Sequence, residues 1–180
     1  DLDALPLPHR GLYYRRYPFM AAFPWKKFTS GRGCYHNCSY CYQPSYREMC
    51  QGKGSYIRRK SPERVVAELE AVRRDYPLGN AHFSDDLFIA DPRWLRRYVD
   101  LTRGTAQLPY TMNCSADLIS EQTAGLLARS GCRAVAIGVE TADQGRRRSI
   151  LGKEISNETI RRAARLIREH GMTLVTFSML

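Results

Sequence analysis

From residue 25 onward, the sequence alternates between short apolar runs and segments with helical periodicity. Expected strands cover residues 26–30, 81–84, 108–113, 133–139 and 173–180. Expected helix starts, where Ser, Asp, Asn or Pro suits a first turn, lie at Ser61-Pro62, Asp91-Pro92, Ser120 and Asn157. Strands separated by helices form parallel βα units with right-handed connections. The alternation predicts an α/β fold, a partial (βα)6-type TIM-like barrel of parallel strands with about five βα units present.

The chain is expected to contain one domain with a flanking segment. Its 180 residues and 43% apolar content suit a single core, which we place at residues 25–180. Residues 1–24 are rich in Pro and aromatic residues, and we expect an extended segment or linker from a preceding domain. The sequence lacks an initiating Met and ends on an apolar strand, which predicts a fragment truncated at the C-terminal end of its core.

Composition also bears on the compartment and on partners. No apolar run approaches the ~20 residues of a membrane span, and no signal peptide pattern is present, so we expect a cytoplasmic protein without a disulfide framework. The net charge is +10, much of it in Arg clusters. Several of these clusters lie on predicted amphipathic helices, and no aromatic stacking motif accompanies them. We therefore favour solvated helix faces over an RNA-binding groove.

Polar and metal-binding side chains gather where the predicted strands end. In a barrel, chemistry lies at the C-terminal ends of the strands. The residues at these ends are Cys34, Cys38, Cys41, Asp85, Asp86, Asn113, Ser115 and Glu140. Their positions predict one site at one end of the sheet.

Cys34, Cys38 and Cys41 form a C-x3-C-x2-C pattern after a glycine-rich turn. A four-iron cluster usually takes four cysteine ligands, so three thiolates leave one iron open for a small-molecule ligand. Zinc is the alternative, but His36 lies inside the loop, where convergence on one tetrahedral ion is awkward. Cys50 is interpreted as a bystander.

The pattern Cys34-x3-Cys38-x-Tyr40-Cys41, after a strand and before βα repeats, resembles the radical S-adenosylmethionine (SAM) superfamily over residues 25–180. Further stretches are similar to its cobalamin (B12)-dependent branch. They are residues 1–8, which resemble the linker from a cobalamin-binding domain, residues 29–34, Asp85-Asp86-x-Phe88 and residues 137–140.

The resemblance implies a [4Fe–4S] cluster held by the three cysteines, with SAM chelating the open iron. In the family, reduction of the cluster cleaves SAM to a 5′-deoxyadenosyl radical that abstracts hydrogen from the substrate. An electron donor such as flavodoxin or ferredoxin is implied, together with a small-molecule or natural-product-like substrate.

The resemblance also implies contacts to SAM. Tyr40 matches the aromatic residue beside the adenine, and Asp85 or Asp86 matches a contact to the SAM amino group. Glu140 lies where the family binds the ribose or the amino acid end. Ser115 departs from the Arg that many relatives in this branch carry. The alternatives are structural: the aspartates cap a turn, Glu140 pairs with a nearby Arg, and Lys153 is either a solvated loop residue or an anion ligand.

The leading function is therefore a radical SAM enzyme of the B12-dependent methyltransferase type, with cobalamin on an N-terminal domain outside this chain. A cobalamin-independent enzyme such as an RNA methylthiotransferase is the first alternative, favoured by the basic charge. An inactive, cluster-binding fragment is the second. In barrels the loops carry specificity, so these motifs predict cofactors and not the substrate.

Overall fold

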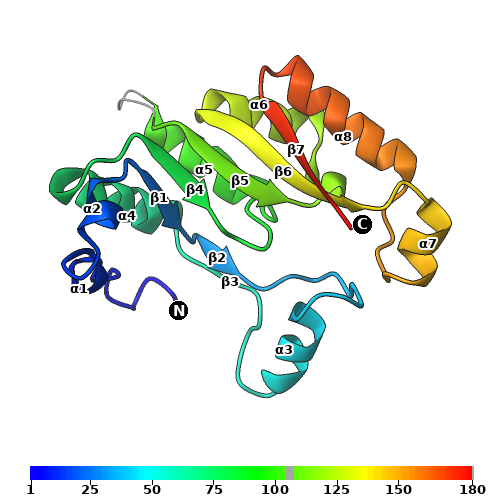
Figure 1. The fold of residues 1–180 in the computed structure, drawn as a ribbon, viewed down its shortest axis with the longest axis horizontal. Coiled ribbons are helices and arrows are strands. Elements are labelled where there is room, and N and C mark those ends of the chain that lie inside the picture. The colour runs from blue at the N-terminus through cyan, green and yellow to red at the C-terminus, as the bar shows by residue number, and fades with distance from the viewer. Residues whose placement is uncertain (104–107, 180) are drawn as a thin grey trace.

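The computed structural model describes residues 1–103 and 108–179. Within these residues, β1 (Trp25–Phe28), β4 (Asn80–Phe83), β5 (Tyr110–Cys114), β6 (Cys132–Glu140) and β7 (Thr173–Ser178) form one parallel sheet in the order β1-β4-β5-β6-β7. Helices α4 (Pro62–Asp75), α5 (Pro92–Thr102), α6 (Glu121–Arg129) and α8 (Asn157–Glu169) alternate with the strands and cover one face of the sheet (Figure 1). The predicted partial barrel is confirmed. Leu180, the last residue of the predicted final strand, lies outside the described residues.

Side-chain caps define where the long helices begin. The predicted caps at Ser61, Asp91 and Ser120 are confirmed. The predicted cap at Asn157 is wrong by one residue, because the hydroxyl of Ser156 accepts a hydrogen bond from the backbone N–H of Thr159 at 3.0 Å. Ser and Asn are both good caps, so the sequence pattern does not separate the two positions.

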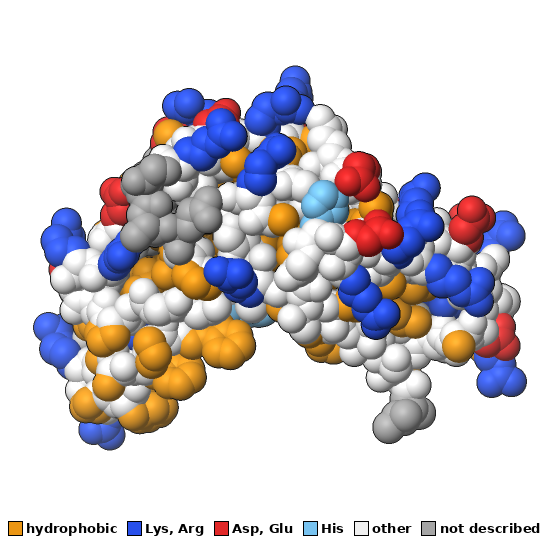
Figure 2. All heavy atoms as spheres, turned by 90° about the horizontal axis from the view of Figure 1, so that it is seen from above, with side chains coloured by type: hydrophobic (Ala, Val, Ile, Leu, Met, Phe, Trp, Pro, Cys, Tyr) orange, Lys and Arg blue, Asp and Glu red, His pale blue; other side chains and the backbone are white. Residues whose placement is uncertain are grey.

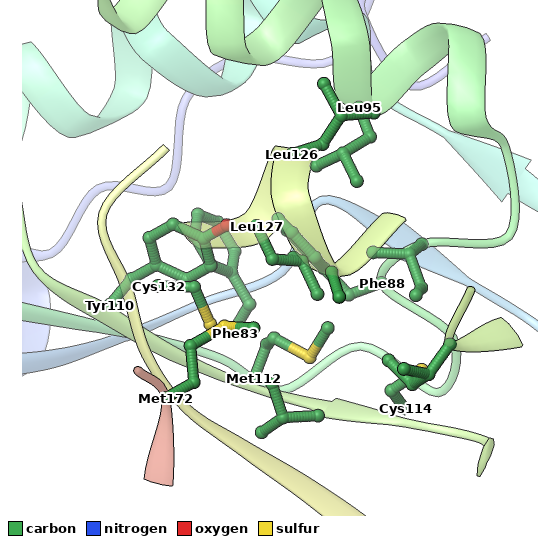
Figure 3. Close-up of a cluster of buried hydrophobic side chains, with 14 of the residues drawn as sticks. Phe83, Phe88, Leu95, Tyr110, Met112, Cys114, Leu126, Leu127, Cys132 and Met172 are labelled. Carbon is green, nitrogen blue, oxygen red and sulfur yellow. The ribbon is translucent and has the colours of Figure 1, made fainter. Parts of the chain in front are cut away.

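The core lies between the helices and the covered face of the sheet. Alternate strand residues, among them Phe83, Tyr110 and Met112, point toward the helices and are fully buried. Leu127 of α6 packs against them, and Cys132 is part of the same cluster (Figure 3). Burying such side chains stabilises the fold by roughly 1.5–3 kcal/mol each.

The opposite face of the sheet is open. The strand residues between the core positions, such as His82, Thr111 and Asn113, lie on this face and are partly exposed. On β7, Val175 and Phe177 are 41% and 54% exposed. The last predicted strand is therefore apolar, as the sequence indicated, but its open-face side chains are solvent-accessible.

The flanking segment is not extended throughout. It contains two short helices, α1 (Gly11–Tyr14) and α2 (Pro18–Ala22), so the predicted extended conformation is wrong over these residues. Arg10 anchors the segment to the core, because its guanidinium donates to the carbonyl of Lys27 at 2.8 Å and to the carboxylate of Glu68 at 3.3 Å.

The connection after β1 carries β2 (Gly31–Arg32), the cysteine residues, α3 (Gln43–Met49) and β3 (Arg58–Arg59), which pairs antiparallel with β2. Residues 144–149 form α7 (Gln144–Ser149) after β6. No helix in the described part of the chain is long and apolar enough to cross a membrane.

The basic side chains follow two patterns. On the face that Figure 2 shows, Lys and Arg residues are spread out with acidic side chains among them. Arg97 pairs with Glu63 at 2.7 Å. Arg147 departs from the solvated interpretation of its cluster. It is completely buried and donates to the carbonyls of Thr141 and Ile155, so it has a structural role in joining the two ends of the α7 segment.

Candidate functional site

A cavity of about 290 Å³ opens where β4, β5 and β6 end. Its lining brings together most of the predicted site residues, namely Cys34, Cys38, Asp85, Asp86, Ser115 and Glu140. The volume is near the lower end of the range for small-molecule sites, which is ~300–1,000 Å³. Cys41 and Tyr40 are not part of the lining, although both belong to the same loop.

The loop that carries the three cysteines, residues 34–41, begins at a glycine that the backbone requires. Gly33 has φ +95°, and a side chain there would lie 2.9 Å from the carbonyl oxygen of Tyr56. Burial raises the pKa of the Cys34 thiol. A backbone hydrogen bond with His36 opposes this rise, and the nearby Asp86 and the other two cysteines add to it.

Two segments hold the loop in place. On one side, Arg47 of α3 donates to the carbonyl of Tyr35 at 3.2 Å and to the side chain of Asn37. On the other side, the backbone N–H of Ser39 donates to the carbonyl of Leu151 at 3.0 Å, and its hydroxyl donates to the carbonyl of Ile150 at 2.8 Å. The loop is thus fixed between α3 and the turn after α7.

The donor set fits an iron–sulfur cluster better than a single ion. Cys34, Cys38 and Cys41 are free thiols. Among residues 1–103 and 108–179, no three Cys, His, Asp or Glu side chains converge on one metal ion, as tetrahedral zinc requires. In a four-iron cluster, each thiolate binds a different iron, so the sulfurs need not converge on one point.

The two aspartates after β4 differ sharply in their surroundings. Asp85 is 2% exposed, and its Oδ1 accepts from the Ser30 hydroxyl at 2.5 Å and from the Gly31 backbone N–H at 2.6 Å. Burial nevertheless raises the pKa of this carboxyl group, against the effect of these hydrogen bonds. Its oxygens tie the end of β1 to the end of β4.

Asp86 is only partly buried. It accepts from the backbone N–H of Gly33 at 2.9 Å and from the hydroxyl of Tyr42 at 3.4 Å. Compared with Asp85, this carboxylate retains more capacity to bind a ligand in the cavity.

Glu140 ends β6 in an unusual backbone conformation. Its φ is +65°, the one positive value at a non-glycine position within the described residues. Its Oε1 accepts from the Tyr40 hydroxyl at 3.0 Å and lies 3.1 Å from Nζ of Lys153. Both Glu140 and Lys153 are 8% exposed. The carboxylate does pair with a cation, but the cation is a lysine rather than the expected arginine.

Lys153, for which the sequence left a solvated loop residue and an anion ligand as alternatives, lines the cavity, and so does Gly138, which sequence reasoning did not identify as a site residue. The Lys153 ammonium also donates to the Gly138 carbonyl at 2.7 Å, so it is buried and not solvated. A side chain at Gly138 would meet both Glu140 and Lys153. The glycine two positions before the predicted ligand Glu140 was the available signal, because glycine in a strand often marks a close approach.

Ser115 and Tyr40 complete the predicted set. The hydroxyl of Ser115 donates to the carboxylate of Asp117, so it is engaged within its own turn. Burial raises the pKa of the Tyr40 hydroxyl, and the charges of Cys38 and Glu140 raise it further, so Tyr40 is a neutral hydrogen-bond donor.

The fold is a parallel α/β partial barrel, with three free cysteines in the loop beside a cavity at its strand ends. The chain belongs to the radical SAM superfamily, because the model of that superfamily matches residues 28–180.

Curated relatives include an uncharacterized methyltransferase of Pyrococcus horikoshii, 24% identical over 96% of this chain and 36% of its own length. The tryptophan 2-C-methyltransferase of Streptomyces laurentii is 30% identical over 60% of this chain and 18% of its own length. The chain thus spans between about a fifth and about a third of these relatives.

Among solved structures, TsrM from Kitasatospora setae, a radical SAM methyltransferase with cobalamin and a [4Fe–4S] cluster bound, has a TM-score of 0.71 and 24% identity. The match covers 94% of this chain and 32% of TsrM. The cobalamin-dependent SAM radical enzyme OxsB has a TM-score of 0.77 and 17% identity, over 97% of this chain and 26% of OxsB. The predicted likeness to cobalamin-dependent enzymes is confirmed as a likeness of fold.

Proposed function

We propose that this chain is the core of an enzyme that cleaves SAM reductively, with a [4Fe–4S] cluster held by Cys34, Cys38 and Cys41. The single observation that carries the proposal is the polar cavity at the strand ends, which two of these cysteines line together with Glu140. Family membership supports it independently. When bound and reduced, the cluster supplies one electron to the sulfonium of SAM.

The chain's own residues bind and orient the cofactor in this proposal. The exposed edge of Asp86 suits a cationic amino group, since a carboxylate gives a charge-assisted hydrogen bond. Glu140 accepts from ribose hydroxyls or the amino group, and Tyr40 places its ring beside the adenine. Asp85 has a structural role, because it accepts hydrogen bonds from the backbone N–H groups of Ser30 and Gly31, which precede the cysteine loop.

Anaerobic reconstitution with iron and sulfide tests the proposal. We expect about four irons per chain, a change in the electron paramagnetic resonance spectrum of the reduced cluster when SAM is added, and 5′-deoxyadenosine as a product. A full cluster without product would favour the alternative of an inactive, cluster-binding protein. No cluster at all would contradict the proposed ligand set.

We further propose a B12-dependent methyltransferase type and a small-molecule substrate. This is supported by relatives named as methyltransferases and by a similar structure of TsrM with tryptophan as substrate, 23% identical with a TM-score of 0.70. The whole polypeptide should then bind cobalamin, through a domain joined to residues 1–24. Absorption spectroscopy of the purified polypeptide with added hydroxocobalamin tests this, and absence of binding would contradict it.

The net charge of +10 favours one other function, modification of RNA as in methylthiotransferases. Against it, basic residues in the clusters have other partners: Arg147 is buried, and Arg148 lies 3.6 Å from Glu154. A gel-shift titration with transfer RNA at about 150 mM salt separates the two functions, because specific RNA binding should survive at this salt concentration whereas weak electrostatic attraction should not.

A further inference from the structure

Lys153 is buried at the junction of three segments. Its ammonium group lies 2.7 Å from the carbonyl of Gly138, 3.1 Å from the carboxylate of Glu140 and 3.5 Å from the hydroxyl of Tyr40. The first two partners belong to β6, and the third lies in the cysteine loop. Lys153 therefore connects the end of β6 to the cysteine loop beside the cavity, and it is not a solvated surface residue.

The turn that carries Lys153 also supports the loop through its backbone. Ile150 and Leu151 accept the hydrogen bonds of Ser39. Gly152 has φ +60°, and a side chain there would lie 3.0 Å from the carbonyl oxygen of Asn37, so the loop backbone rests directly on this glycine. The buried Arg147 holds the start of the turn to Ile155 through a 3.0 Å hydrogen bond. The turn therefore supports the cysteine loop through several backbone contacts.

Lys153 also explains how Glu140 keeps its orientation. A left-handed backbone conformation is unfavourable for a residue with a long side chain and persists only where its surroundings hold it. The ion pair with Lys153 and the hydrogen bond from Tyr40 supply this restraint. A buried carboxylate without its cation would be strongly disfavoured, and Glu140 would turn toward solvent.

We propose that Lys153 is a positioning residue of the SAM site, which holds Glu140 toward the cavity and, through Tyr40, fixes the cysteine loop against the end of β6. For SAM binding the inference rests on the function proposed above. The contact between Lys153 and Tyr40 of the cysteine loop does not involve SAM or a cluster, so it can be tested in the cofactor-free protein.

The test compares Lys153→Met with Lys60→Met in the purified protein. Lys60 is the matched control, because it forms a 2.6 Å ion pair with the buried Glu68 away from the cavity. In the cluster-free protein, hydrogen exchange of residues 34–41 should be at least ~10-fold faster in Lys153→Met and unchanged in Lys60→Met. After reconstitution, Lys153→Met should keep its iron but bind SAM ~10-fold more weakly, the equivalent of one lost charge-assisted contact. Lys153→Arg, which keeps the charge, should restore part of both.

Wild-type loop exchange together with wild-type SAM affinity in Lys153→Met would overturn the proposal, even if the variant melts at a lower temperature, because that result describes a purely structural lysine. If the reconstituted wild-type protein itself fails to bind SAM, the proposed function fails. The exchange experiment then decides the role of Lys153 alone: faster loop exchange supports it, and unchanged exchange refutes it.

Discussion

A methyl group on Gly138 would overlap Oε1 of Glu140, two residues further along β6. The left-handed backbone of Glu140 turns its side chain back over the glycine, and Nζ of Lys153 would be 2.6 Å from the same methyl group. The closeness of these two residues means that the strand end can hold its buried carboxylate only if position 138 has no side chain.

Gly138→Ala should therefore displace the Glu140 side chain. We expect a loss of stability of about 1–3 kcal/mol from overpacking, with SAM affinity reduced in the reconstituted protein. Gly125→Ala is the matched control, because this helical glycine has ordinary space beside His170, at 3.5 Å, and Ala is the better helix former by about 1 kcal/mol. Chemical denaturation and calorimetric SAM titration measure both effects. A Gly138→Ala protein with wild-type stability would show that Glu140 does not need its present position.

Single replacement of Cys34, Cys38 or Cys41 by Ala should abolish the stable cluster, because each thiolate is expected to bind its own iron. Cys50→Ala is the control and should retain wild-type iron and sulfide, since Cys50 lies beyond the C-terminal end of α3. Iron and acid-labile sulfide analysis after reconstitution checks this. Loss of iron in Cys50→Ala would assign that residue to the cluster instead.

Asp85→Asn and Asp86→Asn should have different effects, because Asp85 stabilises the fold and Asp86 is expected to bind SAM. The buried Asp85 carboxylate accepts from Ser30 and Gly31, and hydrogen bonds to charged groups contribute about 1.5–3 kcal/mol. Asp85→Asn should lower the free energy of unfolding by about that amount. Asp86→Asn should leave stability nearly unchanged and weaken SAM binding. The reverse pattern in denaturation and titration experiments would contradict the assignment.

Stability should fall in mild acid partly because of His82. Burial lowers its pKa from the usual 6.5, and the cation of Lys27 lowers it further. The unfolded chain therefore binds a proton at a higher pH than the folded protein, so stability is lost as the pH decreases below about 6.5. His82→Asn, which keeps a polar partner for Thr111, should lose less stability between pH 7.5 and 5.5 in urea denaturation. Equal losses in both proteins would exclude His82 as a source.

The fold could be predicted from the sequence where it depends on local sequence patterns. Helix caps such as Ser61 and Ser120 act within three residues, and the alternation of strands and helices leaves few topologies for parallel βα units. The expected extended conformation of residues 1–24 failed in part. The carbonyls of Met20 and Ala21 in α2 accept hydrogen bonds from the Lys26 ammonium, which lies outside that segment, so the pattern of residues 1–24 does not encode this contact.

The amino-acid sequence by itself determined the superfamily pattern, the parallel sheet and the positions of the cysteines and acidic residues at strand ends. Only the tertiary structure decided which of these side chains are used in hydrogen bonds within the protein and which remain available in the cavity. In the folded chain Asp85 is buried, Asp86 stays partly exposed at the cavity, and Glu140 forms an ion pair with Lys153. The physical reason is range. Tyr40 and Glu140 are 100 residues apart in the chain, and their 3.0 Å contact exists only because the fold brings the cysteine loop to the end of β6.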